Sequence, residues 1–242
     1  MSKRTLIGVL TPSSNTALEP LTSRMVALVP GASAHFARFP VTEISLRDAS
    51  LQQFDDRKIL DAARLLADAH VDVICWSGTS AGWLGFDNDE RLCARITEAT
   101  GLPATTSVLA LNEVLAARGA RTLGLVTPYV ADVQQRIAAN YERVGIRCIA
   151  ERHLDLTVNF AFSEVTPDTL RALVREVARD KPDAITTFCT NLHAAQLAHE
   201  LEAETGVPLY DTVSTVVWKA LKLAGADTSA LRGWGRLFEE QR

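Results

Sequence analysis

Two short segments of this chain carry side chains suited to proton transfer beside a carboxylate. Gly78-Thr79-Ser80 supplies two hydroxyl groups, and Cys189-Thr190-Asn191 supplies a thiol, a hydroxyl and an amide. Hydroxyl, amide and backbone N–H groups can hold an oxyanion, and a thiol can deliver a proton to carbon. Cys189 is therefore the candidate catalytic residue, with Gly78, Thr79, Ser80, Thr190 and Asn191 as candidate substrate-binding residues.

Two interpretations of Cys189 compete. If a helix begins directly after this residue, as its place at the end of an apolar run suggests, the helix N-terminus lowers the pKa of the thiol, which suits a proton carrier. The alternative is a buried core cysteine, which is common. Of the four cysteines, Cys75, Cys93 and Cys148 fall in a predicted strand, helix and strand, and we interpret them as structural. No pair has CxxC spacing, so neither a disulfide framework nor a metal site is predicted.

Two further loops carry groups that favour an anion. Ser14 and Asn15 precede a predicted helix, where they either help to cradle a carboxylate or simply cap the helix. Tyr129 follows the apolar run at 123–127, and its phenol either donates to the same anion or is half-buried packing. The local sequence leaves both choices open.

Apolar periodicity predicts the elements that carry these loops. Strands are expected at Leu6–Leu10, His35–Phe39, Val71–Trp76 and Ala104–Thr106, and helices at Thr16–Leu28, Asp56–Ala69, Asp87–Ala99 and Ala110–Ala117. This alternation is typical of an α/β fold with parallel sheets. Asp87 is interpreted as the N-cap of its helix, with Glu90 in the capping-box position.

The second half of the chain repeats the first. The segments 6–12, 71–74, 99–103 and 118–120 match 123–128, 182–185, 204–208 and 224–226 in the same order. This order predicts an internal duplication, with two parallel-sheet βα lobes related by a pseudo-two-fold axis. We assign residues 1–119 and 213–242 to lobe 1 and residues 120–212 to lobe 2.

The duplication also predicts where the chemistry lies. Aligning Asp72 with Asp183, 111 positions later, places Gly78 opposite Cys189. Ligands in parallel sheets bind beyond the carboxyl ends of the strands. The loops that end in these two residues should therefore face each other across a cleft between the lobes.

With these motifs assembled, the chain resembles the aspartate/glutamate racemase superfamily over nearly its whole length. The resembling segments are Pro12-Ser13-Ser14-Asn15-Thr16, Gly78-Thr79-Ser80, Thr127-Pro128-Tyr129, Asn159, Cys189-Thr190-Asn191 and Gly233-Trp234-Gly235-Arg236-Leu237-Phe238. The segment 12–16 and Asn159 are most similar to maleate isomerases. The segments 78–80 and 233–238 are most similar to arylmalonate decarboxylase. Many members use two facing cysteines, but here Gly78 takes the first position, as in the decarboxylase branch.

The resemblance implies a cofactor-independent decarboxylase that acts at a carbon next to a carboxylate. Cys189 would protonate one face of an enediolate, with no metal, and a small carboxylate or dicarboxylate would be the substrate. The implied binding residues are Ser14, Asn15, Gly78, Thr79, Ser80, Tyr129, Asn159, Thr190 and Asn191. Trp76 or Trp83 is expected in an apolar part of the pocket. A cis–trans isomerase and a racemase are the alternatives within the superfamily.

Two alternatives come from other classes. Gly78-Thr79-Ser80-Ala81-Gly82 fits the G-x-S-x-G pattern of serine hydrolases, with Ser80 as nucleophile and His153, His193 or His199 as base. The same cleft could instead bind a carboxylate without chemistry.

The composition excludes some classes of binding partner. The 242 residues are 47% hydrophobic and 22% charged, with a net charge of −4 and no basic cluster, so nucleic acid is not an expected partner. No run approaches the roughly 20 apolar residues that span a membrane. Residues 1–4 lead directly into a predicted strand, which favours a cytoplasmic protein. A homo-oligomer is possible, although one chain supplies a complete cleft.

Overall fold

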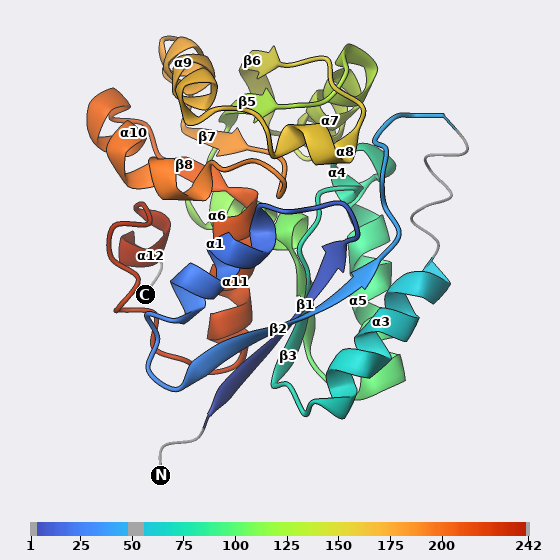
Figure 1. The fold of residues 1–242 in the computed structure, drawn as a ribbon. Helices are drawn as coiled ribbons and strands as arrows, with labels where there is room; N and C mark the ends of the chain where they lie inside the picture. The colour runs from blue at the N-terminus through green and yellow to red at the C-terminus, as the bar shows by residue number, and fades with distance from the viewer. Residues whose placement is uncertain (1–3, 48–55, 241–242) are drawn as a thin grey trace.

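Two parallel sheets form the framework of the protein (Figure 1). The computed structural model describes residues 4–47 and 56–240. The first sheet has the order β2-β1-β3-β4, with β1 (Thr5–Pro12), β2 (Ala32–Phe39), β3 (Val73–Trp76) and β4 (Ala104–Thr106). The second has the order β6-β5-β7-β8, with β5 (Thr122–Thr127), β6 (Arg147–His153), β7 (Ala184–Thr187) and β8 (Leu209–Asp211). The predicted α/β class with two parallel-sheet lobes is confirmed.

Helices cover both sheets, as the apolar periodicity predicts. Those that follow lobe 1 strands are α1 (Leu18–Val26), α3 (Asp56–Asp68), α4 (Ala81–Leu84), α5 (Phe86–Thr100) and α6 (Ser107–Ala117). The remainder are α7 (Ala131–Arg143), α8 (Asn159–Phe162), α9 (Pro167–Ala178), η2 (Ala195–Leu197), α10 (Ala198–Thr205), α11 (Thr212–Leu223) and α12 (Leu237–Glu240). The four strands and four helices expected in the first half are all present, with bounds that differ by a few residues.

The internal repeat is matched by equivalent hydrogen bonds at the N-terminal ends of the two inner strands of each sheet. Asp72 Oδ2 accepts a hydrogen bond from Leu6 N at 2.8 Å, which ties the start of β3 to β1. Asp183 Oδ2 accepts from Arg121 N and Thr122 N, both at 2.8 Å, which ties the start of β7 to β5 in the same way. The 111-residue register used to align the halves therefore joins equivalent positions of the two sheets.

Helix α11 returns the chain from the second sheet to the first. It packs against α6, α1 and β3. The segment after α11 contacts the second lobe again: Arg236 Nη1 donates to Gly206 O, at the end of α10, at 3.1 Å. Helix α11 thus packs on lobe 1, whereas Arg236 contacts lobe 2, and the assignment of residues 213–242 to lobe 1 stays a prediction.

The capping role predicted for Asp87 is wrong. Helix α5 begins at Phe86, and Gly85 is its N-cap with a φ of 109°, a conformation that favours glycine. Because Gly85 turns the chain directly from α4 into α5, the helix starts before Asp87 is reached. Asp87 lies in the first turn, where it pairs with Arg91 one turn further on.

Asp89, in the same acidic run, is buried in lobe 1. Its side chain is 2% exposed and accepts a hydrogen bond from Thr106 Oγ1. Burial raises the pKa of this carboxyl from 3.8 to about 7, and the Thr106 hydrogen bond opposes only part of the rise. The folded protein therefore holds a proton at Asp89 that the unfolded chain releases near pH 4.

This burial predicts a pH-dependent stability. A carboxyl whose pKa is raised on folding stabilises the protein below its unfolded pKa, and that contribution is lost as the pH rises through about 7. We expect the free energy of unfolding to fall by up to about 1.4 kcal/mol per pH unit between about pH 4 and 7 from this group. Asp89→Asn should reduce this slope in urea unfolding at pH 5, 6, 7 and 8. The exposed Asp87→Asn should not, and an equal slope in Asp89→Asn and the parent would contradict the prediction.

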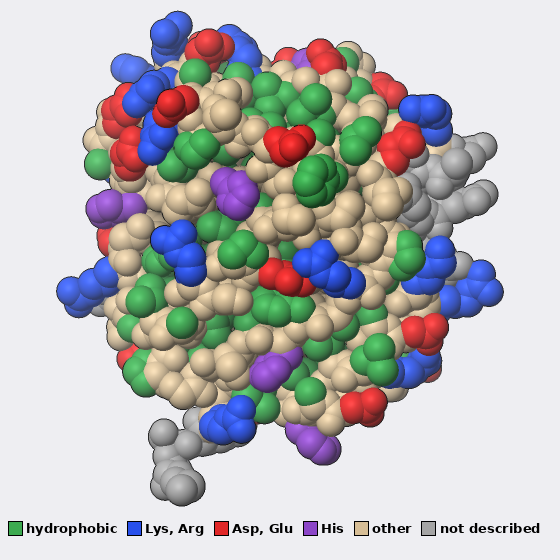
Figure 2. Space-filling view, viewed as in Figure 1, with side chains coloured by type: hydrophobic (Ala, Val, Ile, Leu, Met, Phe, Trp, Pro, Cys, Tyr) green, Lys and Arg blue, Asp and Glu red, His purple; other side chains and the backbone are tan. Residues whose placement is uncertain are grey.

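Charges are mixed on the visible surface. Figure 2 shows Lys and Arg side chains interspersed with Asp and Glu on the face it presents. Over residues 4–47 and 56–240, no helix is both long and apolar enough to cross a membrane. Residues 1–3, on which the cytoplasmic prediction partly depends, lie outside the described residues. The location and the oligomeric state stay predictions.

Candidate active site

A small pocket lies where loops from both lobes meet, beyond the carboxyl ends of β1, β3, β5 and β7. Its empty volume is about 290 Å³. It is lined by Pro12, Val41, Ile44, Trp76, Gly78, Thr79, Ser80, Trp83, Tyr129, Asn159, Cys189 and Thr190. The predicted meeting of the Gly78 and Cys189 loops is thus present. None of the described residues that line the pocket is charged, so any anion there is held by neutral donors.

The loop after β7 does not continue into a helix. Residues 190–194 form turns, η2 follows, and α10 begins only at Ala198. The predicted helix start at Cys189 is wrong. Thr190 and Asn191 use their side chains to reach lobe 1 instead, and such residues favour turns over helix interiors.

The lowered thiol pKa expected for Cys189 is also wrong. The residue is 3% exposed, and burial raises the pKa of its thiol from 9.0 to about 12, although hydrogen bonds from Tyr129 and the Asn191 N–H oppose the rise. The buried Asp211 carboxyl adds to the increase. Without a helix N-terminus to stabilise the thiolate, burial dominates. Cys189 therefore carries its proton at neutral pH.

Tyr129 joins the two loops across the pocket. Its hydroxyl lies 2.7 Å from Thr79 Oγ1 in lobe 1. It also opposes the rise in the pKa of the Cys189 thiol in lobe 2. Burial raises the pKa of Tyr129 well above its ordinary value, so the phenol stays neutral. The phenol ring packs edge-on against Trp83, with centroids 5.3 Å apart. Thr79, Tyr129 and Cys189 thus line the pocket together as neutral donors.

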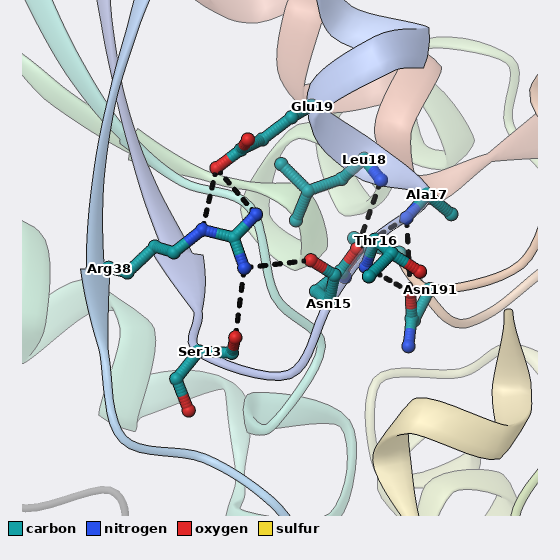
Figure 3. Close-up of polar contacts among 9 residues, drawn as sticks. Ser13, Asn15, Thr16, Ala17, Leu18, Glu19, Arg38 and Asn191 are labelled. Carbon is teal, nitrogen blue, oxygen red and sulfur yellow. Dashed lines mark hydrogen bonds and ion pairs between the residues drawn. The ribbon is translucent and has the colours of Figure 1, made fainter.

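The side chains of the loop after β1 cap the helix that follows it. Asn15 Oδ1 accepts from Ala17 N and Leu18 N, both at 3.0 Å. Asn191 Oδ1 from lobe 2 accepts from Thr16 N at 3.0 Å and Ala17 N at 3.2 Å (Figure 3). Because these amide oxygens satisfy the start of α1, the cap interpretation of this loop fits the structure, and the cradle interpretation stays a prediction.

Ser14, Asn15 and Asn191 lie behind the pocket wall. Ser14 Oγ donates to Val41 O at 2.6 Å and accepts from Asn159 Nδ2 at 2.8 Å. Asn191 Nδ2 donates to Asn159 O. These bonds brace Asn159, which does line the pocket, and direct contact of the three residues with substrate stays a prediction.

Thr190 both lines the pocket and links the lobes. Its hydroxyl donates to Ser77 O at 3.1 Å and accepts from Asn15 Nδ2 at 3.3 Å. Its hydroxyl hydrogen is therefore used by the protein, and its backbone N–H donates to no other described residue. The backbone N–H groups of Thr79 and Ser80 likewise have no acceptor within the described chain. These three N–H groups and that of Gly78 are free to donate to an anion at the pocket, beside the Thr79 and Tyr129 hydroxyls.

Arg38 is a supporting residue that sequence reasoning missed. Figure 3 shows its guanidinium between Glu19 and the loop after β1. It donates to Ser13 O at 2.8 Å and Asn15 O at 3.0 Å, and pairs with Glu19 Oε1 at 2.9 Å. Arg38 thereby fixes the loop backbone, and nothing in the spacing of the sequence signals this role.

Gly78 has no room for a side chain. A Cβ atom there would lie 2.1 Å from Cζ2 and 2.3 Å from Cε2 of Trp76. Trp76 and Trp83, the two tryptophans proposed for the apolar part, both line the pocket. Val41 and Ile44 complete the apolar wall and were not anticipated, because they lie in an irregular segment after β2 without periodicity. Lobe 1 therefore offers no thiol opposite Cys189, which is the only cysteine among the described residues that line the pocket.

The geometry does not support Ser80 as a hydrolase nucleophile. Its backbone has φ −57° and ψ −33°, an ordinary helical conformation rather than the strained turn of a nucleophile elbow. No histidine is among the described residues that line the pocket. His153, one of the proposed bases, hydrogen-bonds Glu151 Oε2 at 2.9 Å on the surface. Ser80 is placed as a wall residue of the pocket.

Comparison with known proteins decides the family. The family model described as arylmalonate decarboxylase matches residues 9–238. The chain belongs to the arylmalonate decarboxylase family. The predicted membership of the aspartate/glutamate racemase superfamily is confirmed, and so is the prediction of an enzyme in the decarboxylase or isomerase class.

Individual relatives agree with this membership. Arylmalonate decarboxylase from Bordetella bronchiseptica is 33% identical over 185 residues, which cover 75% of this chain and 77% of that protein. A solved arylmalonate decarboxylase carrying Gly-to-Cys and Cys-to-Ser substitutions, in its liganded form, has a TM-score of 0.84 at 25% identity and covers 98% of this chain and all of that one. Maleate cis–trans isomerase from Nocardia farcinica, with a succinylcysteine intermediate, has a TM-score of 0.87 at 21% identity and covers 98% of this chain and 99% of that one, a likeness of fold.

Proposed function

We propose that this family member decarboxylates a substituted malonate without a cofactor, with Cys189 as the proton donor. The observation that carries the proposal is the single protonated thiol in the pocket, opposite a glycine. A two-thiol racemase needs a second proton carrier, and none of the described pocket residues supplies one. A decarboxylase needs one proton on one face after carbon dioxide leaves.

In this proposal one carboxylate is held by neutral donors of both lobes. The Thr79 and Tyr129 hydroxyls and the N–H groups of Thr79, Ser80 and Thr190 surround the polar part of the pocket. Such preorganised donors stabilise an oxyanion strongly when water is excluded. After bond cleavage the same donors would stabilise the enediolate oxygens.

The second carboxylate would lie against the apolar wall formed by Val41, Ile44 and Trp83. A carboxylate without donors is costly to hold there, whereas neutral carbon dioxide is not. The expected substrate is therefore a malonate with an alkyl or aryl substituent.

The reaction balances with groups already in the pocket. The bond from the central carbon to the departing carboxylate breaks, and its electron pair stays on the remaining fragment as the enediolate. The Cys189 S–H then protonates the central carbon, and the thiolate recovers its proton from water. The raised pKa of Cys189 favours this donor role, because a thiol that acts first as a nucleophile must already be a thiolate.

Proton NMR in deuterium oxide tests the proposal with a panel of arylmalonates, alkylmalonates, maleate, aspartate, glutamate and a hydantoin. We expect loss of carbon dioxide from a malonate, with one deuterium gained at the product carbon. Deuterium exchange without loss of carbon dioxide would indicate racemase-type proton transfer instead. Conversion of maleate to fumarate would establish isomerase chemistry and require a nucleophile other than a thiol at residue 78.

A further inference from the structure

The position opposite Cys189 is filled by an aromatic side chain. The Trp76 ring lies where a side chain at Gly78 would begin, with Cη2 at 2.6 Å from the Cβ position in addition to the two closer atoms. Trp76 is 1% exposed, and its ring packs on Phe39 with centroids 4.9 Å apart. Because the ring is part of the core, it cannot swing aside without a loss of packing.

The two lobes differ at the residue two positions before the facing pair. Trp76 ends β3 before Gly78, whereas Thr187 ends β7 before Cys189. Thr187 Oγ1 is turned to Asp211 Oδ2, to which it donates at 2.8 Å. The repeat therefore places a large side chain before the glycine in lobe 1 and a small one before the cysteine in lobe 2.

We propose that Trp76 restricts proton delivery to the Cys189 face, because its indole occupies the place from which a second thiol would act. The consequence for stereochemistry rests on the proposed decarboxylation, but the steric relation of Trp76 and Gly78 does not. Gly78→Cys alone should fail to provide a second proton donor. Trp76→Thr with Gly78→Cys, which gives lobe 1 the Thr-x-Cys pattern of lobe 2, should provide one.

The steric part is tested by urea unfolding of the parent, the two single variants and the double variant. We expect Gly78→Cys to lower the unfolding midpoint in the parent, and to leave it unchanged or raise it in the Trp76→Thr background. Gly82→Ala is the matched control, since a Cβ at Gly82 would lie 2.4 Å from the Phe188 ring. Trp76→Thr should not rescue Gly82→Ala. Should Trp76→Thr not fold, Trp76→Leu takes its place.

The stereochemical part uses a prochiral methyl-aryl malonate and measures the enantiomer ratio of the product. The parent and Gly78→Cys should yield one enantiomer, and the double variant should yield both. A mixture from Gly78→Cys alone would overturn the proposal, as would an equal midpoint loss from Gly78→Cys in both backgrounds. If no malonate reacts with any of the four proteins, the proposed function fails, and the unfolding data alone decide the role of Trp76.

Discussion

Cys189→Ala is expected to lower kcat/KM for a malonate by about 10³-fold or more, because no other described pocket residue can donate a proton to carbon in its place. The buried thiol is small, so the loss of stability should be about 1 kcal/mol and the protein should stay folded. Product formation by NMR and unfolding by circular dichroism measure the two effects separately.

Cys75→Ala provides the matched control. Cys75 is 1% exposed, lies in β3, and has a thiol pKa that burial raises to about 12, as for Cys189. It is not among the residues that line the pocket. We expect a similar loss of stability with kcat/KM unchanged. Turnover by Cys189→Ala at the parent rate would refute its role as proton donor.

Tyr129→Phe should lower kcat by about 10²-fold, the size of effect seen when one oxyanion donor is removed. The substitution removes the hydroxyl that bonds Thr79 and lowers the pKa of the Cys189 thiol, and leaves the ring that packs against Trp83 and Phe162. Steady-state kinetics at saturating substrate measure the effect. A change confined to KM would show that the hydroxyl stabilises the bound substrate and the transition state equally, and so does not favour the chemical step.

Tyr141→Phe is the control for a buried phenol. The Tyr141 hydroxyl is buried, has no hydrogen-bond partner within the described chain, and lies outside the pocket. Removing an unsatisfied buried hydroxyl should leave stability unchanged or raise it by about 1 kcal/mol, with kcat unaffected. Equal losses of kcat in the two variants would mean that Tyr129 acts through packing.

The position of the site can be predicted from the sequence because the internal repeat shows which loops face each other. The 111-residue spacing is enough to place Gly78 opposite Cys189, since the strand order is the same in both lobes and the β1–β3 pair has the same register as the β5–β7 pair. Thr79 and Tyr129 follow from their place directly after strands. These predictions depend only on the order of strands and helices along the chain, which hydrophobic periodicity indicates well.

Contacts between segments that are distant in the sequence cannot be predicted from hydrophobic periodicity. Asn191 has the composition of a local cap, yet it caps α1 in the other lobe, and this cross-lobe bond is why no helix follows Cys189. Asp89 sits in an exposed-looking acidic run but faces the core against Thr106. Val41 and Ile44 have no periodic neighbours. In each case a tertiary contact outweighs the local pattern.

The burial of Cys189 has a consequence for oxidative chemistry. Thiolates that solvent can reach attack peroxides and disulfides, whereas Cys189 is neither ionised at neutral pH nor exposed. The residue should therefore escape conversion to sulfenic acid and mixed disulfides under conditions that inactivate enzymes with exposed catalytic thiolates. Such a catalyst would retain its activity in aerated solution without added reductant.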